Sequence, residues 1–250
     1  MKKMMLTLAA LVLSAAVVSA QDREIDLERI EEFNKLELTR EASHVQVKLS
    51  TVFPMYFGWS ALTNVNYKGD WAQYEGTGCL DTRTGKNFVY GLELADVHFK
   101  PSGTPLDVSL GLRWTFMDFT FSHPDYTIRA EGSSYVFRDI KTELNPKYNY
   151  GKSKVHASYF GIPLRVALRF GHASAYAGAS AELLTGGYAK YKRPKDRTQI
   201  GGVFNPFRAT IEGGFHYGTL GVYVQYGLTP LFKESLSDAR TLTLGFTLGL

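Results

Sequence analysis

The last ten residues of the chain alternate between two kinds of side chain. Even positions from 242 to 250 hold Leu or Phe, whereas odd positions from 241 to 249 hold Thr or Gly. Because successive side chains of a β-strand point to opposite faces, this pattern predicts a strand with one apolar and one small, neutral face. Strands of water-soluble proteins usually carry charge on the wet face, so the small second face favours a crowded barrel interior.

Six more segments alternate clearly, and a seventh is rich in Ala with poorly distinguished faces. Their lengths are close to the ~9–11 residues that a tilted membrane strand needs. The clear segments are 53–61, 87–94, 106–116, 160–170, 207–217 and 220–229, and the weak one is 173–183. Together with the final strand, the pattern predicts eight strands.

The connections between these segments alternate strictly between short and long. The short ones are 100–105, 171–172 and 218–219, and the long ones are 65–86, 122–153, 190–203 and 232–239. Up-and-down barrels of the outer membrane have short periplasmic turns and longer outer loops. Since lipid does not tolerate open sheet edges, the sheet must close. We therefore predict an all-β fold, a closed antiparallel transmembrane barrel of eight strands.

The N-terminus predicts export from the cytoplasm. Lys2 and Lys3 precede an apolar stretch that ends in Val18-Ser19-Ala20, which is typical of a cleavable secretory signal. We assign residues 1–20 to a signal peptide cleaved near Ala20, 21–50 to a short periplasmic segment and 51–250 to the barrel. In the periplasmic segment a helix is compatible with the charged residues 22–44, whereas the pattern over 36–49 favours two short extended pieces.

Charge and chemistry motifs narrow the possible functions. Removal of the leader leaves 26 of the 28 Lys and Arg against 24 Asp and Glu, so the formal charge is only +2 and indicates no nucleic-acid partner. Cys79 is the single cysteine, which predicts no internal disulfide. Nucleophile-elbow, zinc-protease, phosphate-loop and Cys/His metal spacings do not occur in the sequence. We predict no catalytic residue, no cofactor, no metal and no enzymatic activity.

Strand parity predicts a set of charged side chains that face the lumen. An eight-stranded barrel is just wide enough for side chains to fill it, and charges there must pair or be hydrated. A salt-bridged plug is the favoured interpretation, and a path for protons or small solutes is the alternative. The predicted set is Glu93, Arg113, Arg165, Arg169, Glu182, Arg208, Glu212 and His216.

Two further groups of residues suggest alternatives. His156 and Ser158 share one strand face, which is the spacing that a lipid-modifying enzyme could use but is also a common coincidence. The long connection 122–153 carries several aromatic residues that could bind a partner or glycan, although extension of the hairpin beyond the membrane is favoured. These aromatics are Tyr126, Tyr135, Phe137, Tyr148 and Tyr150; Trp59, Trp114, Tyr188 and Tyr226 are expected in interfacial belts.

Three motifs in the later strands resemble those of the PorT-like outer-membrane β-barrel family. They are Asn205-Pro206-Phe207, the run from Tyr226 to Phe232 with Pro230-Leu231-Phe232, and Pro163-Leu164. The resemblance covers about the last hundred residues well and the first half of the barrel in outline. It implies an outer-membrane barrel, and one branch of the family belongs to a protein-secretion apparatus. The terminal Leu250 departs from the Phe that commonly ends such barrels.

The sequence thus predicts an outer-membrane protein of a Gram-negative bacterium with a structural or interaction role. Its expected partners are outer-membrane lipid, the barrel-assembly machinery and a protein contacted by the outer loops or the periplasmic segment. A component of a secretion or transport apparatus is the first alternative, and a lipid-modifying enzyme is the second.

Overall fold

The computed structural model describes residues 45–50, 54–101, 103–149 and 151–249. The predicted signal peptide, residues 21–44 of the predicted periplasmic segment, Tyr150 and Leu250 lie outside the described residues. The folded unit that contains the strands runs from Val45 to Leu250.

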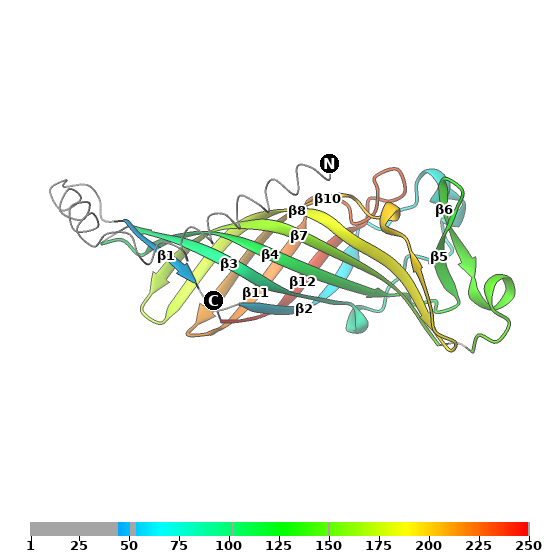
Figure 1. Cartoon of the computed structure of the whole chain (residues 1–250), viewed down its shortest axis with the longest axis horizontal. Helices are drawn as coiled ribbons and strands as arrows, with labels where there is room; N and C mark the ends of the chain where they lie inside the picture. Colours follow the sequence, from blue (N-terminus) through cyan, green and yellow to red (C-terminus); the bar gives the residue numbers. More distant parts are fainter. Residues whose placement is uncertain (1–44, 51–53, 102, 150, 250) are drawn as a thin grey trace, which may run out of the picture. The chain divides into compact units, whose positions relative to one another are not determined.

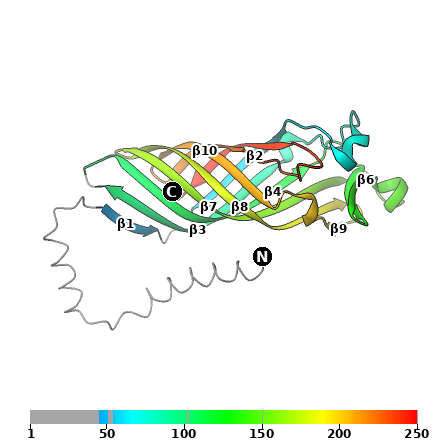
Figure 2. The ribbon, with the colours of Figure 1, turned by 90° about the horizontal axis from the view of Figure 1, so that it is seen from above.

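Eight antiparallel strands close into a ring (Figure 1). Going round the ring, each strand pairs with the next, in the order β3-β2-β12-β11-β10-β8-β7-β4, and pairing of β4 with β3 closes it. The strands cross the axis of the ring obliquely, as closure of a small barrel requires (Figure 2). Their bounds are β2 Met55–Thr63, β3 Phe88–Pro101, β4 Leu106–Thr120, β7 Lys152–Phe170, β8 Ala173–Lys192, β10 Phe207–Tyr217, β11 Leu220–Gly227 and β12 Arg240–Leu248.

The predicted fold class is confirmed, and each predicted segment corresponds to one strand of the ring. The weak segment 173–183 is the start of β8, which is the longest strand at 20 residues. Together with β7, of 19 residues, it continues well beyond the ~9–11 residues that cross a membrane. These two strands therefore carry the barrel wall into the region of the long connections.

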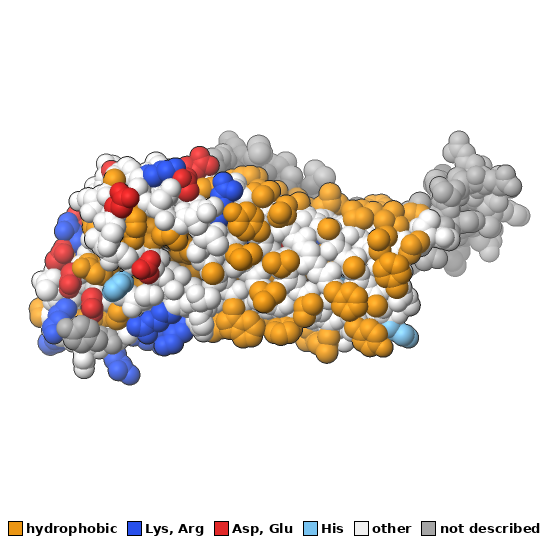
Figure 3. Space-filling view, turned by 180° about the vertical axis from the view of Figure 1, so that it is seen from behind, with side chains coloured by type: hydrophobic (Ala, Val, Ile, Leu, Met, Phe, Trp, Pro, Cys, Tyr) orange, Lys and Arg blue, Asp and Glu red, His pale blue; other side chains and the backbone are white. Residues whose placement is uncertain are grey.

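The two faces of each strand differ as the alternation predicts. In β12, Leu244 is 65% exposed while its neighbour Thr243 is 0% exposed, because the lumen is filled and the outer wall is bare. Figure 3 shows apolar side chains over the barrel wall, while acidic and basic side chains gather towards the long-loop end. The outer wall is thus an apolar surface that surrounds a polar interior.

Two β-bulges reverse the parity part-way along a strand. In β3 the extra residue is Leu94, so that odd positions face the lumen before it and even positions face the lumen after it. In β8 the extra residue is Thr185, which lies opposite the Ser158–Tyr159 step of β7. A bulge re-aims every following side chain, and both of these decide which charged groups lie inside.

An additional strand, β1 (Val45–Ser50), pairs antiparallel with the Asp96–Pro101 end of β3. It lies on the edge of β3 that β2 occupies farther along the strand. The prediction of extended structure is therefore correct for residues 45–50, and strand pairing starts ahead of residue 51.

The long connections contain short elements of their own. They are η2 (Gly69–Tyr74), η3 (Thr84–Lys86), the hairpin β5 (Tyr126–Glu131) with β6 (Ser134–Asp139), η4 (Ile140–Leu144), β9 (Asp196–Gln199), which pairs with β8, and η5 (Gly201–Val203). Among the described residues, no helix has the length and hydropathy to cross a membrane.

Candidate functional site

Two arginines and two glutamates meet in the lumen. Arg113 donates to Glu212 through Nη1 and Nη2 at 2.7 Å each, and to Glu93 Oε1 through Nε at 3.1 Å and Nη2 at 3.0 Å. Arg165 donates to Glu212 Oε1 through Nε at 2.6 Å and to Glu93 Oε2 through Nη1 at 2.7 Å. Each guanidinium therefore binds both carboxylates, and the four formal charges cancel.

A second ion pair continues this network. Arg208 donates from Nη1 to Glu182 Oε2 at 2.5 Å and from Nη2 to Gln225 Oε1 at 3.0 Å. The Gln225 amide donates in turn to Glu212 Oε2 at 3.2 Å, so it connects the second pair to the first four residues. Three arginines are thus balanced by three glutamates, all buried. Charges out of water are tolerated when they are paired and hydrogen-bonded in this way.

Tyrosine rings pack over the arginines of this network. The guanidinium of Arg113 lies 5.1 Å from the ring centroid of Tyr56, and that of Arg165 lies 5.4 Å from the ring of Tyr176. Cations over aromatic faces are stabilised by the ring quadrupole, and more so away from water. The rings also fill lumen space that the charged side chains leave.

Glycines on the lumen face make room for these large side chains. A Cβ atom on Gly178 would lie 2.9 Å from Cγ of Arg165, and one on Gly214 would lie 2.5 Å from Cε1 of Tyr176. At this level the structure leaves a cavity of about 10 Å³, lined by Tyr56, Arg113, Arg165, Tyr176, Glu212, Tyr223 and Thr247. That is about the space of one water molecule.

The remaining two predicted lumen residues lie nearer the short-turn end. His216 hydrogen-bonds Thr247 Oγ1 through Nε2 at 2.8 Å and stacks on Tyr176 with ring centroids 5.0 Å apart. Arg169 pairs with Asp107 and its side chain is 48% exposed, so it belongs to the mouth of the barrel rather than to the buried network. The structure therefore brings six of the eight predicted residues into one network and leaves His216 and Arg169 beside it.

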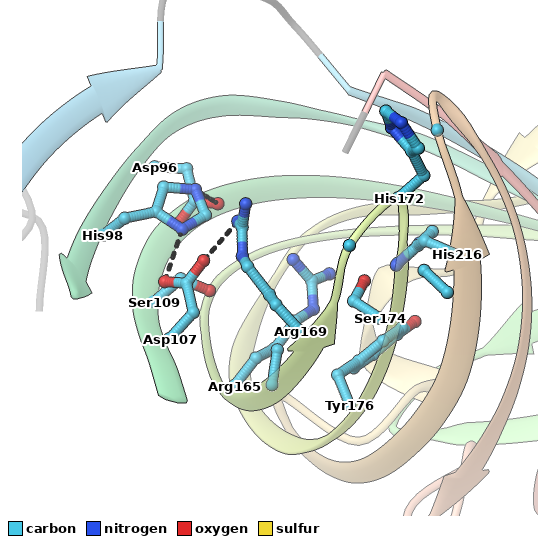
Figure 4. Close-up of a pocket in the computed structure, with 14 residues that line it drawn as sticks. Asp96, His98, Asp107, Ser109, Arg165, Arg169, His172, Ser174, Tyr176 and His216 are labelled. Carbon is cyan, nitrogen blue, oxygen red and sulfur yellow. Dashed lines mark hydrogen bonds and ion pairs between the residues drawn. The ribbon is translucent and has the colours of Figure 1, made fainter. Parts of the chain in front are cut away.

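The mouth at the short-turn end holds a cluster that strand parity did not predict (Figure 4). His98 lies between two carboxylates, with Nε2 3.1 Å from Asp96 Oδ2 and Nδ1 2.9 Å from Asp107 Oδ1. A cavity of about 110 Å³ opens beside them. Asp96 and His98 face inward only because of the bulge at Leu94, and strict alternation from Phe88 would place both on the outer face of the barrel.

The four long connections pack on one another at the opposite end of the barrel. Trp71 is 0% exposed, with its ring centroid 5.0 Å from that of Phe137 and 5.2 Å from that of Phe232, and its indole N–H donates to the Tyr135 carbonyl at 2.8 Å. Phe232 also stacks on Phe204 at 5.7 Å. We call these connections, residues 64–87, 121–149, 193–206 and 228–239, the cap.

The cap accounts for most of the aromatics predicted in the connection 122–153. Phe137 and Tyr148 are buried within it, and Tyr126 and Tyr135 are partly buried. Arg129 from β5 donates to both Thr198 and Asp196 of β9, which joins the hairpin to the neighbouring connection. These aromatic side chains therefore serve packing inside the cap rather than an open binding surface.

Trp71 was not among the residues predicted from the sequence, although it lies at the centre of the packed cap. A Trp in a polar connection needs apolar partners, but the partners of Trp71 come from two other long connections, through Phe137 and Phe232.

His156 and Ser158 are placed on the outer wall near the cap. His156 Nδ1 is 2.9 Å from Asp118 Oδ1, and its ring stacks on Tyr188 with centroids 4.6 Å apart. The Ser158 hydroxyl donates to the Gly186 carbonyl at 3.4 Å and accepts from Thr185 at 2.9 Å. Among the described residues, no hydrogen bond joins this serine to the imidazole. No group of described His, Cys, Asp and Glu residues could hold a metal ion.

No family model and no curated protein matches the chain. Among solved structures, it is similar to Neisserial surface protein A, at 9% identity over 81% of this chain and 99% of that one, with a TM-score of 0.37. It is also similar to Ail, the attachment invasion locus protein of Yersinia pestis, at 11% identity over 79% and 96% of the two chains, with a TM-score of 0.32. The barrel assignment rests on the strand pairing of the chain itself, and the resemblance to the PorT-like family stays a prediction.

Proposed function

We propose that the chain is an integral outer-membrane β-barrel protein whose lumen is plugged, and that it acts through its outer surface rather than by conduction or catalysis. The observation that carries this proposal is the reversal of polarity across the wall. Apolar side chains face outward from every strand of the ring, while paired charges fill the inside. Among β-structures, only a closed barrel has no unpaired sheet edge in lipid, and a closed barrel is the architecture of the ring.

The lengths of the connections support an orientation. The short turns would lie in the periplasm and the cap outside the cell, as in other barrels of this kind. A structural or interaction role fits the cap, because its apolar side chains are used in packing the four connections together. A protein partner would then bind the polar outer side of a pre-formed surface. Such binding loses less conformational entropy than binding to four separate flexible loops would.

Two features, one after the other along the barrel axis, support the plug. The Arg and Glu network fills the lumen within the ring of strands, and the apolar residues of the cap cover its long-loop end. A passage would have to break ion pairs that lie away from water, which is costly.

Two measurements test the proposal. The protein should fractionate with the outer membrane and migrate on a gel differently before and after heating, as folded barrels do. In planar bilayers it should show no conductance above the background. A protein that stays soluble in the periplasm would overturn the barrel proposal, and steady ion conductance would overturn the plug alone.

A further inference from the structure

The outer wall carries a cluster of basic side chains where β7 and β8 pass the apolar band. Lys152 lies opposite Lys192 in the pairing of the two strands, and Lys154 lies opposite Lys190. The row continues onto β9, where Arg197 is the partner of Lys190, and Lys195 stands in the connecting turn. We call Lys152, Lys154, Lys190, Lys192, Lys195 and Arg197 the basic face.

The bulge at Thr185 is what turns this face outward. Before the bulge, odd positions of β8 such as Leu183 point out, and after it the outward positions are even. Tyr188, Lys190 and Lys192 therefore share the outer wall with Leu183. Without the extra residue these side chains would point into the cap, where Ala189 and Tyr191 now lie buried. One inserted residue thus places the cations outside.

The basic face is largely without compensating charge. Lys154 pairs with Asp118 at 2.7 Å, and Asp118 also binds His156. Among the described residues, Lys152, Lys190, Lys192 and Lys195 have no ion pair. Arg197 lies 3.8 Å above the ring of Tyr188, which fixes its side chain against the wall. A compact set of like charges with so little neutralisation is a surface that attracts anions.

The order of side chains along the wall indicates where the anion lies. Leu183 and Phe160 belong to the apolar outer wall, Tyr188 and His156 follow as stacked rings, and the lysines come next. An apolar band, then aromatic rings, then cations is the sequence met when a wall passes from hydrocarbon into the layer of lipid headgroups. The cations of β7 and β8 stand on the same outer face as the apolar side chains farther along these strands.

We propose that the basic face binds the phosphate groups of an anionic glycolipid in the outer leaflet. This inference rests on the proposed function, because it needs the cap to lie outside the cell. Clusters of Lys and Arg at a membrane surface bind anionic headgroups through the same electrostatics. The continuity of the face with the lipid-exposed wall favours a lipid over a soluble polyanion.

The test uses the whole chain folded in detergent and bisphosphorylated lipid A as the probe, with binding followed by native mass spectrometry. Lys190→Gln/Lys192→Gln should weaken binding by about tenfold, since each lysine near a headgroup contributes substantially. Lys147→Gln/Lys233→Gln removes the same charge from exposed positions of the cap and should change binding less than about twofold. Removal of the phosphates from the lipid should weaken binding to the wild type as much as the first variant does.

The outcomes separate this inference from the proposed function. Equal binding of lipid with and without phosphates, or equal losses in the two double variants, would show that the basic face is not the lipid site. If soluble heparin binds with the same dependence on Lys190 and Lys192 while lipid A does not, the face recognises a soluble polyanion and the inference is wrong. A heat-modifiable outer-membrane barrel that fails either test leaves the proposed function intact.

Discussion

The lumen and the cap are both filled interiors, yet they are built from opposite chemistry. Arg208, Glu182 and their neighbours fill the lumen with paired charges, whereas Trp71 and the rings around it fill the cap with apolar side chains. The lumen is surrounded by a wall of paired strands, and the polar side chains inside it hydrogen-bond one another. The cap consists of connections between strands, so burial of apolar surface must stabilise it.

This difference predicts how a substitution should destabilise each region. A missing partner in the lumen leaves a charge without water, and the whole barrel bears the cost. A missing ring in the cap leaves a cavity among connections that can open locally while the barrel stays folded.

The largest expected effect is from breaking the Arg208–Glu182 pair. Arg208→Met removes the cation and leaves Glu182 buried without its ion-pair partner, which should lower the free energy of unfolding by about 3–5 kcal/mol. Urea unfolding of the protein in lipid vesicles, followed by tryptophan fluorescence, measures it.

The control is Arg208→Met/Glu182→Gln, which removes both charges and should recover most of the loss. If the double variant is as unstable as the single one, packing of the arginine rather than its pairing stabilises this part of the lumen.

The next largest effect is expected from removing a buried ring of the cap. Trp71→Ala deletes the ring that contacts Phe137 and Phe232, at a cost of about 3 kcal/mol, the lower end for burial of this size. The substitution should destabilise the cap against local unfolding without destabilising the barrel. Limited proteolysis should therefore cut the cap much faster, while the urea midpoint of the barrel hardly changes. Trp59→Ala, on the exposed apolar outer wall of the barrel, is the matched control and should leave proteolysis of the cap unchanged. A large drop in the urea midpoint of Trp71→Ala would mean that cap and barrel unfold as one unit.

How far the sequence predicts each region follows from its periodicity. Strand alternation of period two placed Arg113, Arg165 and Glu212 in the lumen, because parity holds wherever a strand is regular. The predicted segment ends at residue 94 and does not reach Asp96, which the bulge at Leu94 turns inward. Long-range contacts such as Trp71 with Phe232 have no period at all, so the cap could not be predicted from local pattern.

A smaller effect is expected from adding a methyl group at either of two adjacent glycines, one of which faces the lumen. Gly214→Ala would place Cβ 2.5 Å from the Tyr176 ring and from the Val222 carbonyl oxygen, so we expect a loss of about 1–3 kcal/mol from overpacking. Gly213→Ala points to the other face, where the nearest atom is the Tyr176 carbonyl oxygen at 3.4 Å, and should stay within about 0.5 kcal/mol of the wild type. Equal urea midpoints for the two variants would show that the lumen can relax around an added methyl group.

The smallest effect concerns the polar link that joins β5 to β9 in the cap. Burial tends to raise the pKa of Asp196, but its bonds to the Arg129 guanidinium outweigh burial and hold that pKa below the ordinary value. A carboxylate with a lowered pKa in the folded state stabilises that state above its unfolded pKa, and the contribution is lost as the pH falls through the folded pKa. The link should therefore be complete at pH 6 and weaken below about pH 4.

Trp71 can report this loss, because it lies within the cap. In a Trp59→Phe/Trp114→Phe background, acrylamide quenching of Trp71 should rise modestly between pH 6 and pH 3, since a pair with Asp196 37% exposed contributes at most about 1 kcal/mol. Asp196→Asn should show the higher quenching at pH 6 already and a flatter response to acid. If the variant keeps the full pH response, other carboxylates of the cap govern its opening, and the Arg129–Asp196 link holds the hairpin no more tightly than the buried rings do alone.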